Sequence, residues 1–273
     1  MTKYKYNNEL DERKRKRLDH KLKIVEKRDR LLIKDRTSDR AVFEEVFDKS
    51  TLMILYTLLN LGIVEQIFGV LKSGKESRIY RGVDSEGTVI ALKIYLTVAI
   101  EFKRMLPYIQ GDPRFKHIKR SKRSLVYAWA QKEFKNLQRA YAAGIYVPKP
   151  IHVKKNVLIM EFIGEGDIPV PTLKDKPPKN LTTAKRMYKV LIRNVQILYQ
   201  KAGLVHGDLS EYNIMNKDGI PIIFDMSQAV LVDHPKAEEF LLRDLNNLNR
   251  FFKRTGIQVK ETKKLYKWVT KGK

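Results

Sequence analysis

The chain has 273 residues, which is long for one domain and short for three, so we expect one extended domain or two lobes. Hydrophobic residues make up 43% of it, enough to form a packed core. Lys and Arg number 55 against 31 Asp and Glu, and the net charge of +24 favours polyanionic partners. Because cysteine is absent, disulfides, thiolate metal sites and thiol nucleophiles are excluded.

Residues 1–48 are predicted to form a basic helical extension, because apolar residues recur at helical spacing among the charges. No apolar segment follows Met1, which argues against a signal peptide. The longest uncharged stretch, residues 50–64, has 15 residues, whereas a membrane-spanning helix needs about 20. We therefore expect a cytoplasmic protein that does not contact membranes.

Residues 49–163 are predicted to form a first lobe that is rich in strands. It begins with an apolar helix over residues 50–61. Three strands separated by short, glycine-containing turns follow, over residues 64–71, 77–83 and 88–95. A long helix over residues 124–143 and a hairpin over residues 151–162 complete this lobe. The short connections favour an antiparallel sheet.

The second half of the chain is predicted to be mostly helical. Residues 164–254 form a second lobe, with helices over 182–202 and 235–254 and strand segments over 214–216 and 221–224. Residues 97–123 are predicted to be a flexible basic insert in the first lobe, and residues 255–273 a basic C-terminal tail. Strands first and helices later indicate an α+β protein of two lobes.

The positive charge lies in three segments at the periphery of this body. Residues 1–40, 103–123 and 253–273 each carry a net charge of +7, so the remaining residues are nearly neutral. One such run is commonly a solvated helix face, but three together favour an RNA or ribonucleoprotein partner. No feature indicates specificity for a DNA sequence.

The segment from His206 to Asn213 and the later Asp225 hold the residues best suited to chemistry. Asp208 is followed five residues on by Asn213, and Asp225 ends an apolar strand. Carboxylate and amide oxygens are ligands that Mg²⁺ prefers, and a further Asp is left to receive a proton. Phosphoryl transfer needs this set. The alternative is a polar turn without a catalytic role.

Two further elements support phosphate chemistry. Lys93, at the end of the third strand, would hold phosphates if it pointed into a cleft, with Glu133 of the long helix as its partner. The alternatives are a solvent-facing Lys93 and a surface ion pair for Glu133. The loop joining the first two strands can bring backbone N–H groups and hydroxyls to phosphate oxygens through Ser73, Gly74, Lys75 and Ser77.

These elements, in this order, resemble a protein-kinase fold, and their details resemble the atypical RIO kinases, in particular the first subfamily. The likeness runs from about Val42 to Arg254. Four motifs carry it: Ser73-Gly74-Lys75-Glu76-Ser77, His206-Gly207-Asp208-Leu209-Ser210-Glu211-Tyr212-Asn213, Asp225-Met226-Ser227-Gln228-Ala229-Val230 and Asp233-His234-Pro235.

The resemblance implies Asp208 as the catalytic base, Asn213 and Asp225 as ligands of Mg²⁺, with Mn²⁺ as an alternative metal, and Lys93 as the phosphate-binding lysine. Members of the family are associated with ATP hydrolysis through a phosphorylated aspartate, which matches Asp225. The resemblance also implies that adenine lies at the junction of the lobes. The residues that hold it there would be Met160, Glu161 and Ile163.

The chain also departs from ordinary protein kinases. Gly207 replaces an arginine, Asp225 is not followed by Phe-Gly, and no Ala-Pro-Glu follows, so the platform for a peptide substrate is missing. We expect an Mg-ATP-dependent serine/threonine kinase or ATPase that acts on precursors of the small ribosomal subunit and phosphorylates itself on Ser121 or Ser124. The alternatives are an RNA-binding scaffold with an inactive kinase-like body, and an aminoglycoside-type phosphotransferase, which would need an acidic pocket.

Overall fold

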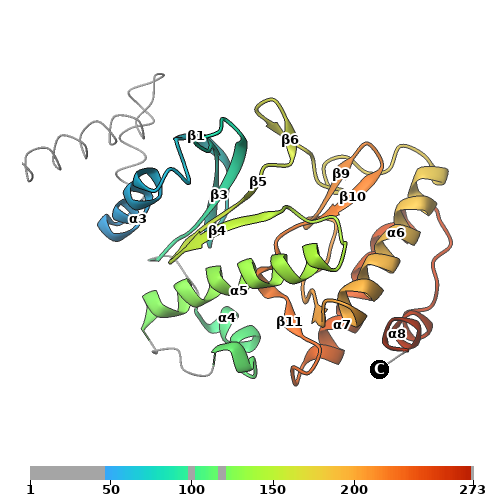
Figure 1. Cartoon of the computed structure of the whole chain (residues 1–273). Helices are drawn as coiled ribbons and strands as arrows, with labels where there is room; N and C mark the ends of the chain where they lie inside the picture. The colour runs from blue at the N-terminus through green and yellow to red at the C-terminus, as the bar shows by residue number, and fades with distance from the viewer. Residues whose placement is uncertain (1–46, 98–101, 116–120, 272–273) are drawn as a thin grey trace, which may run out of the picture.

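The computed structural model describes residues 47–97, 102–115 and 121–271, and they form two lobes (Figure 1). The helix predicted within residues 1–48 lies almost wholly outside the described residues. None of the described helices combines the length and apolar character needed to cross a membrane. The α+β organisation expected from the sequence is confirmed, with a sheet in the first lobe and helices in the second.

The first lobe is built on a five-stranded antiparallel sheet with strand order β1-β2-β3-β5-β4. Its strands are β1 (Gln66–Ser73), β2 (Ser77–Val83), β3 (Val89–Tyr95), β4 (Pro150–Lys154) and β5 (Val157–Glu161). Two helices pack on it, α3 (Lys49–Asn60) and α5 (Lys122–Ala142). Side chains of Asp48 and Ser121 cap the first turns of these helices.

Strand β3 is buried on both faces, and this determines where Lys93 points. Side chains alternate along a strand. Ile90, Leu92 and Ile94 pack with α3 in one apolar cluster. The intervening residues therefore face the opposite side, where Tyr95 packs with Trp129 of α5. Lys93 shares this side, so it is directed toward α5.

The second lobe contains three helices and short hairpins around one large core. The helices are α6 (Leu181–Gln200), α7 (Ala237–Arg254) and α8 (Thr262–Thr270). The paired strands are β6 (Gly164–Glu165) with β7 (Ile168–Pro169), β8 (Leu204–Val205) with β11 (Val230–Leu231), and β9 (Ile214–Lys217) with β10 (Ile220–Ile223). A 3₁₀ turn, η2 (Met226–Gln228), follows β10.

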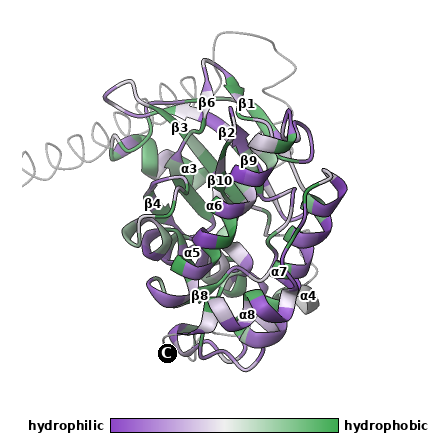
Figure 2. Ribbon diagram, turned by 90° about the vertical axis from the view of Figure 1, so that its right-hand side faces the viewer, coloured by the Kyte–Doolittle hydropathy of each residue, from purple (hydrophilic) through white to green (hydrophobic). Residues whose placement is uncertain are grey.

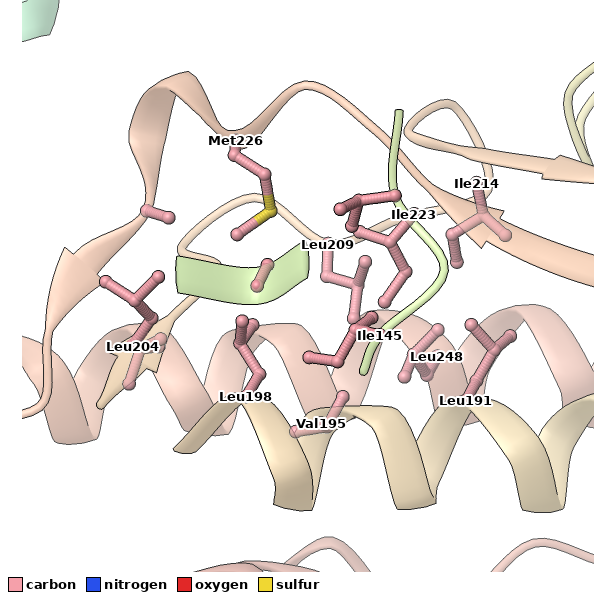
Figure 3. Close-up of a cluster of buried hydrophobic side chains, with 14 of the residues drawn as sticks. Ile145, Leu191, Val195, Leu198, Leu204, Leu209, Ile214, Ile223, Met226 and Leu248 are labelled. Carbon is pink, nitrogen blue, oxygen red and sulfur yellow. The ribbon is translucent and has the colours of Figure 1, made fainter. Parts of the chain in front are cut away.

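The core of the second lobe anchors the segments that carry the predicted site residues. Leu209, Ile214, Ile223 and Met226 are buried in it among Leu191, Val195, Leu198 and Leu248 of α6 and α7 (Figure 3). These four residues are immediate chain neighbours of Asp208, Asn213, Phe224 and Asp225. Burial of apolar neighbours therefore fixes the backbone from which the polar side chains project.

Two predictions about the basic segments need correction. Residues 255–273 were expected to be a tail, but α8 packs on α6 and α7 and buries Leu265 and Val269. The described residues of the segment 97–123, which was expected to be a flexible insert, include α4 (Phe102–Ile109) and the 3₁₀ turn η1 (Pro113–Phe115). Met105 and Ile109 of α4 are buried against Trp129. Apolar side chains spaced four residues apart hold each of these short helices in place.

Candidate active site

Lys93 lies between two carboxylates at the junction of the lobes. Its Nζ is 2.9 Å from Glu133 Oε1 on α5 and 2.9 Å from Asp225 Oδ1, which follows β10. The hydroxyl of Tyr95 donates a hydrogen bond to the other oxygen of Glu133. The structure thus brings together the three charged groups that the sequence had placed on separate elements, and the solvent-facing alternative for Lys93 is wrong.

The charges of this cluster determine its protonation. Burial alone would lower the pKa of Lys93, but Asp225 and Glu133 outweigh burial and raise it above its usual value. Desolvation would raise the pKa of Asp225, yet the ammonium of Lys93 and a hydrogen bond from Ser227 hold it well below its usual range. Burial raises the pKa of Glu133. At neutral pH the cluster therefore holds a charged lysine and an ionised Asp225.

Asp225 is positioned by an unusual backbone and by its own turn. Its φ is +59°, in the left-handed region, and its Oδ1 accepts a hydrogen bond of 2.6 Å from Ser227 Oγ. Helix α5 fastens the rest of this turn. Lys132 donates to the carbonyl oxygens of Ser227 and Ala229, and Asn136 Nδ2 donates to those of Met226 and Ala229 at 2.9 and 2.8 Å.

Asp208 is held by two amide side chains. Asn213 Nδ2 donates to its carbonyl oxygen at 2.8 Å and to Oδ2 at 3.1 Å, and Gln228 Nε2 approaches Oδ2 at 3.3 Å. Burial, together with the negative charge of Asp225, raises the pKa of Asp208 above that of an ordinary carboxyl group. A carboxylate with a raised pKa is a better proton acceptor, as a general base requires.

Asp244 of α7 supports the backbone around Asp208. It was not among the residues predicted from the sequence. Its two oxygens accept hydrogen bonds of 2.8 Å from the backbone N–H groups of Gly207 and Leu209. Burial raises the pKa of Asp244 to about 7 despite these bonds. The sequence pattern could have indicated it, because Asp244 is a charged residue within the apolar stripe of α7 that contains Leu241, Leu245 and Leu248. Lys132 and Asn136 of α5, which are also buried polar residues, were not predicted either.

The hairpin β9–β10 brings the two predicted metal ligands together. Ile214 pairs with Ile223, and Phe224 N donates to Asn213 O at 3.0 Å, so Asn213 and Asp225 leave adjacent ends of one hairpin. The amide nitrogen of Asn213 is used by Asp208, which leaves its oxygen to face a ligand. Within the described residues, no group of three or more acidic or His side chains forms a complete metal site. One carboxylate and one amide suit Mg²⁺ that is also bound by phosphate and water.

The loop predicted to approach phosphates connects β1 and β2 next to this site. Gly74 N donates to Ser77 O at 2.9 Å, and a Cβ on Gly74 would meet that oxygen at 3.2 Å. Ser73 and Lys75 are exposed, and Ser77 is half-buried. At the start of the loop, Lys72 Nζ lies 5.6 Å from the ring centroid of Phe224, beside Asp225. The loop therefore lies above the end of β10.

The residues predicted to hold adenine lie where the lobes join, at the end of β5. Met160 pairs with Ala91, two residues before Lys93, and Met160 and Ile163 are buried. The Glu161 carboxylate accepts a hydrogen bond of 3.0 Å from Lys149 N. Their assignment to adenine stays a prediction. So does phosphorylation of Ser121 and Ser124, whose hydroxyls are 2.8 Å apart at the start of α5.

The chain matches the RIO domain over residues 78–265. It is 41% identical over 229 residues to the RIO-type serine/threonine-protein kinase Rio1 of Haloferax volcanii, covering 84% of this chain and 77% of that protein. For Rio1 of Methanocaldococcus jannaschii the identity is 39% over 269 residues, covering 98% and 89%. It is 41% identical to human RIO1 over 240 residues, covering 87% of this chain but only 42% of the human protein.

The fold is also that of a kinase in this group. The crystal structure of the Rio2 kinase–ADP/Mg²⁺–phosphoaspartate complex from Chaetomium thermophilum superposes with a TM-score of 0.61 at 26% identity, covering 81% of this chain and 66% of that one. The structure of the Rio2 kinase from the same organism gives a TM-score of 0.57, covering 80% and 67%. The chain therefore belongs to the RIO family of atypical serine/threonine-protein kinases and is of the Rio1 type.

Proposed function

We propose that this protein binds ATP with Mg²⁺ between its lobes and transfers or hydrolyses the terminal phosphoryl group. The observation that carries the proposal is the convergence of Lys93, Glu133 and Asp225 beside Asp208 and Asn213. Glu133 fixes the position of Lys93, whose ammonium binds phosphate oxygens. Asn213 and Asp225 would hold the metal, which would supply positive charge to offset that of the phosphates. Mn²⁺ as a substitute metal stays a prediction.

In phosphotransfer, Asp208 receives the proton of the attacking hydroxyl. Its raised pKa and its support by Asn213 suit this role. A cavity of about 450 Å³ opens beside Asp208 between α4 and α7 and gives an acceptor hydroxyl a route to it. Its charged lining has three acidic side chains, Glu76, Asp208 and Glu239, and two basic ones, Lys236 and Arg243. The two basic side chains largely offset the acidic ones, so the cavity is not the strongly acidic pocket that an aminoglycoside-type enzyme would need for a polycationic acceptor.

In hydrolysis, the ionised Asp225 is a suitable nucleophile. One of its carboxylate oxygens would bond to the terminal phosphorus while the bond from that phosphorus to the oxygen of the leaving nucleoside diphosphate breaks, and water would later cleave the acyl phosphate. The low pKa of Asp225 keeps it ionised for this attack. The structure of Rio2 as an ADP/Mg²⁺–phosphoaspartate complex gives this route a precedent in a related protein.

We also propose that the partner is RNA-rich, as in small ribosomal subunit precursors, and that Ser121 or Ser124 receives phosphate. The support is the net charge of +24 and its concentration in three segments. The competing hypothesis is an RNA-binding scaffold with an inactive body. Retention of a buried acid and lysine set argues against it, because such groups are costly to bury without a function.

The test is a single-turnover assay with radiolabelled ATP and Mg²⁺ on the wild type, Asp208→Asn and Asp225→Asn. Loss of the aspartate should lower the rate about 10²–10³-fold in each case. Asp218→Asn is the matched control, because Asp218 is an exposed residue in the β9–β10 turn with a φ of +48° that Asn adopts readily. Equal, negligible rates for the wild type and both active-site variants would favour the inactive scaffold.

A further inference from the structure

The basic C-terminal segment is a folded part of the second lobe, and its lysines lie on a fixed surface. Leu265 and Val269 bury one side of α8, while Lys263, Lys264, Lys267, Trp268 and Lys271 are exposed. Gln200 Nε2 donates to the carbonyl oxygens of Val269 and Lys271 at 2.9 and 2.8 Å, and Gln196 Nε2 donates to that of Trp268 at 3.3 Å. Helix α6 thus fixes the C-terminal end of α8.

Two rows of basic side chains meet at Trp268. On α8, Lys264 and Trp268 are spaced four residues apart and so share one face, and Lys271 follows at the C-terminal cap of the helix. On α6, exposed Lys185, Lys189 and Arg193 form a row with a spacing of four, and Arg193 bonds the Gln196 side chain that holds the Trp268 carbonyl. We call the exposed basic side chains of these two rows, with Lys267 and Trp268, the α6–α8 face. Figure 2 shows the ribbons of the two helices that carry it.

The charge of this face is almost uncompensated. Neither α6 nor α8 contains an acidic residue. Within the described part of the chain, ion pairs of these side chains are limited to Lys264 with Glu261, at 3.7 Å and with both groups exposed. Trp268 is 40% exposed and is the one exposed large hydrophobic residue on α8. In Figure 1, α6 and α8 lie at the opposite end of the molecule from α3.

We propose that the α6–α8 face binds single-stranded RNA, with the phosphates on the lysines and arginine and an unpaired base stacked on Trp268. This rests on the RNA partner in the proposed function and assigns its contact surface. A single-stranded nucleic acid offers phosphates together with exposed base faces, and cations next to an aromatic ring match both. RNA is the nucleic acid that the proposed function names. An anionic membrane fits less well, because interfacial helices insert several apolar side chains and α8 exposes one.

Because the two tryptophans differ in exposure, tryptophan fluorescence can report on binding at the α6–α8 face. Trp129 is 1% exposed and Trp268 is 40% exposed, so quenching of tryptophan fluorescence by a base reports on Trp268. Titration of the full chain with a single-stranded RNA of mixed sequence should quench this emission. Trp268→Phe should remove the quenching, and Trp268→Ala should weaken binding about tenfold. A duplex RNA of the same length should quench little, because its bases are stacked and paired.

The charges are tested by salt dependence. Changing Lys264, Lys267 and Lys271 to Gln should reduce the slope of log affinity against log salt by about 2, because each phosphate contact on a single strand contributes about 0.7. The matched control changes three scattered exposed lysines, Lys49, Lys155 and Lys179, to Gln and should keep the slope. ATP turnover should be unchanged in both triple variants, because none of these residues lies at the active site.

The outcomes separate this surface from the proposed function. RNA binding without quenching, or an unchanged salt slope in the α8 variant, would refute RNA binding at the α6–α8 face. The proposal of an RNA partner would be unaffected. Failure of the wild type to bind RNA would overturn both the surface and the RNA partner, while the ATP assay still judges the enzyme. Lysine-dependent binding to vesicles of phosphatidylcholine and phosphatidylserine, without RNA binding, would assign the face to a membrane and overturn the inference.

Discussion

Helix α5 contributes to two buried lysine clusters, Glu133 to one and Lys132 to the other, and the lysine has different partners in each. In the Lys93 cluster, the ammonium lies between the carboxylates of Glu133 and Asp225. In the Lys132 cluster, the amine donates only to the carbonyl oxygens of Ser227 and Ala229. Both lysines are almost fully buried. The difference between the clusters therefore comes from their partners and not from their depth.

The protonation of the two lysines differs accordingly. Carboxylates raise the pKa of Lys93 above its usual value, whereas burial and the nearby charge of Arg114 lower the pKa of Lys132 to about 7. The lowered pKa makes the neutral amine more accessible near neutral pH than for an ordinary lysine, and its two N–H groups match the two carbonyl acceptors. In the proposed function one lysine would supply a charge for phosphate, whereas the other supplies hydrogen bonds that hold the turn after Asp225.

The largest effect is expected from breaking the Lys93 cluster with Lys93→Met. Loss of the ammonium should lower ATP turnover about 10²–10³-fold, because the charge that binds phosphate is gone. The change also leaves Glu133 buried without its cation, which costs about 3 kcal/mol of unfolding free energy. Turnover and denaturant unfolding measure the two effects. Lys155→Met, at the exposed β4–β5 turn, is the control, and near-normal turnover of Lys93→Met would refute the role assigned to this lysine.

The second largest effect is expected from substitutions of Lys132, which distinguish the contribution of its hydrogen bonds from that of its charge. Lys132→Met removes both donors and should lower turnover about tenfold by loosening the turn after Asp225. Lys132→Gln keeps two N–H donors without a charge and should retain more of the activity than the Met variant. Comparable loss in both variants would mean that a charged Lys132 is needed. Thermal unfolding of both proteins shows whether they are folded at the assay temperature.

The third prediction concerns the pH dependence of stability. The pKa of Lys132 is about 7 in the folded chain, whereas in the unfolded chain it has the ordinary value of 10.5. Between these two pH values the unfolded chain therefore binds one more proton than the folded chain. The free energy of unfolding should therefore rise with pH over this window, by up to about 1.4 kcal/mol per pH unit from this group. Lys132→Met lacks the group. The difference in unfolding free energy between wild type and variant should follow this curve, and a flat difference would contradict it.

Much of the Lys93 cluster could be predicted from the sequence, because its residues belong to elements with clear patterns. Lys93 stands in an apolar strand, Asp225 ends another, and Asp208 and Asn213 lie in one short polar segment. The prediction used their chemistry and order along the chain. Their distances depended on the β9–β10 register and on the packing of α5, which no local pattern contains.

The Lys132 cluster and the two short helices were missed for physical reasons. Lys132 and Asn136 are polar residues on the buried side of α5, and only their partners 90 or more residues away make that placement favourable. Helix α4 has eight residues with Pro107 inside it, and α8 has nine residues, three of which are lysines. Such helices are too short to be stable alone, so tertiary packing of Met105, Ile109, Leu265 and Val269 decides that they form.

The smallest effect should come from Arg114, which connects the basic insert to the Lys132 cluster. Arg114 bonds Asn136 Oδ1 at 2.9 Å and pairs with Asp112 at 2.6 Å, and its charge helps to lower the pKa of Lys132. Arg114→Gln should raise that pKa, so the pH-dependent rise in stability should begin above pH 7. Because Asp112 has the opposite influence on Lys132, the double variant Asp112→Asn/Arg114→Gln should begin its rise between those of the wild type and the single variant. Denaturant unfolding across pH measures all three curves, and a single variant whose rise begins below pH 7 would show that Arg114 does not set the charge of Lys132.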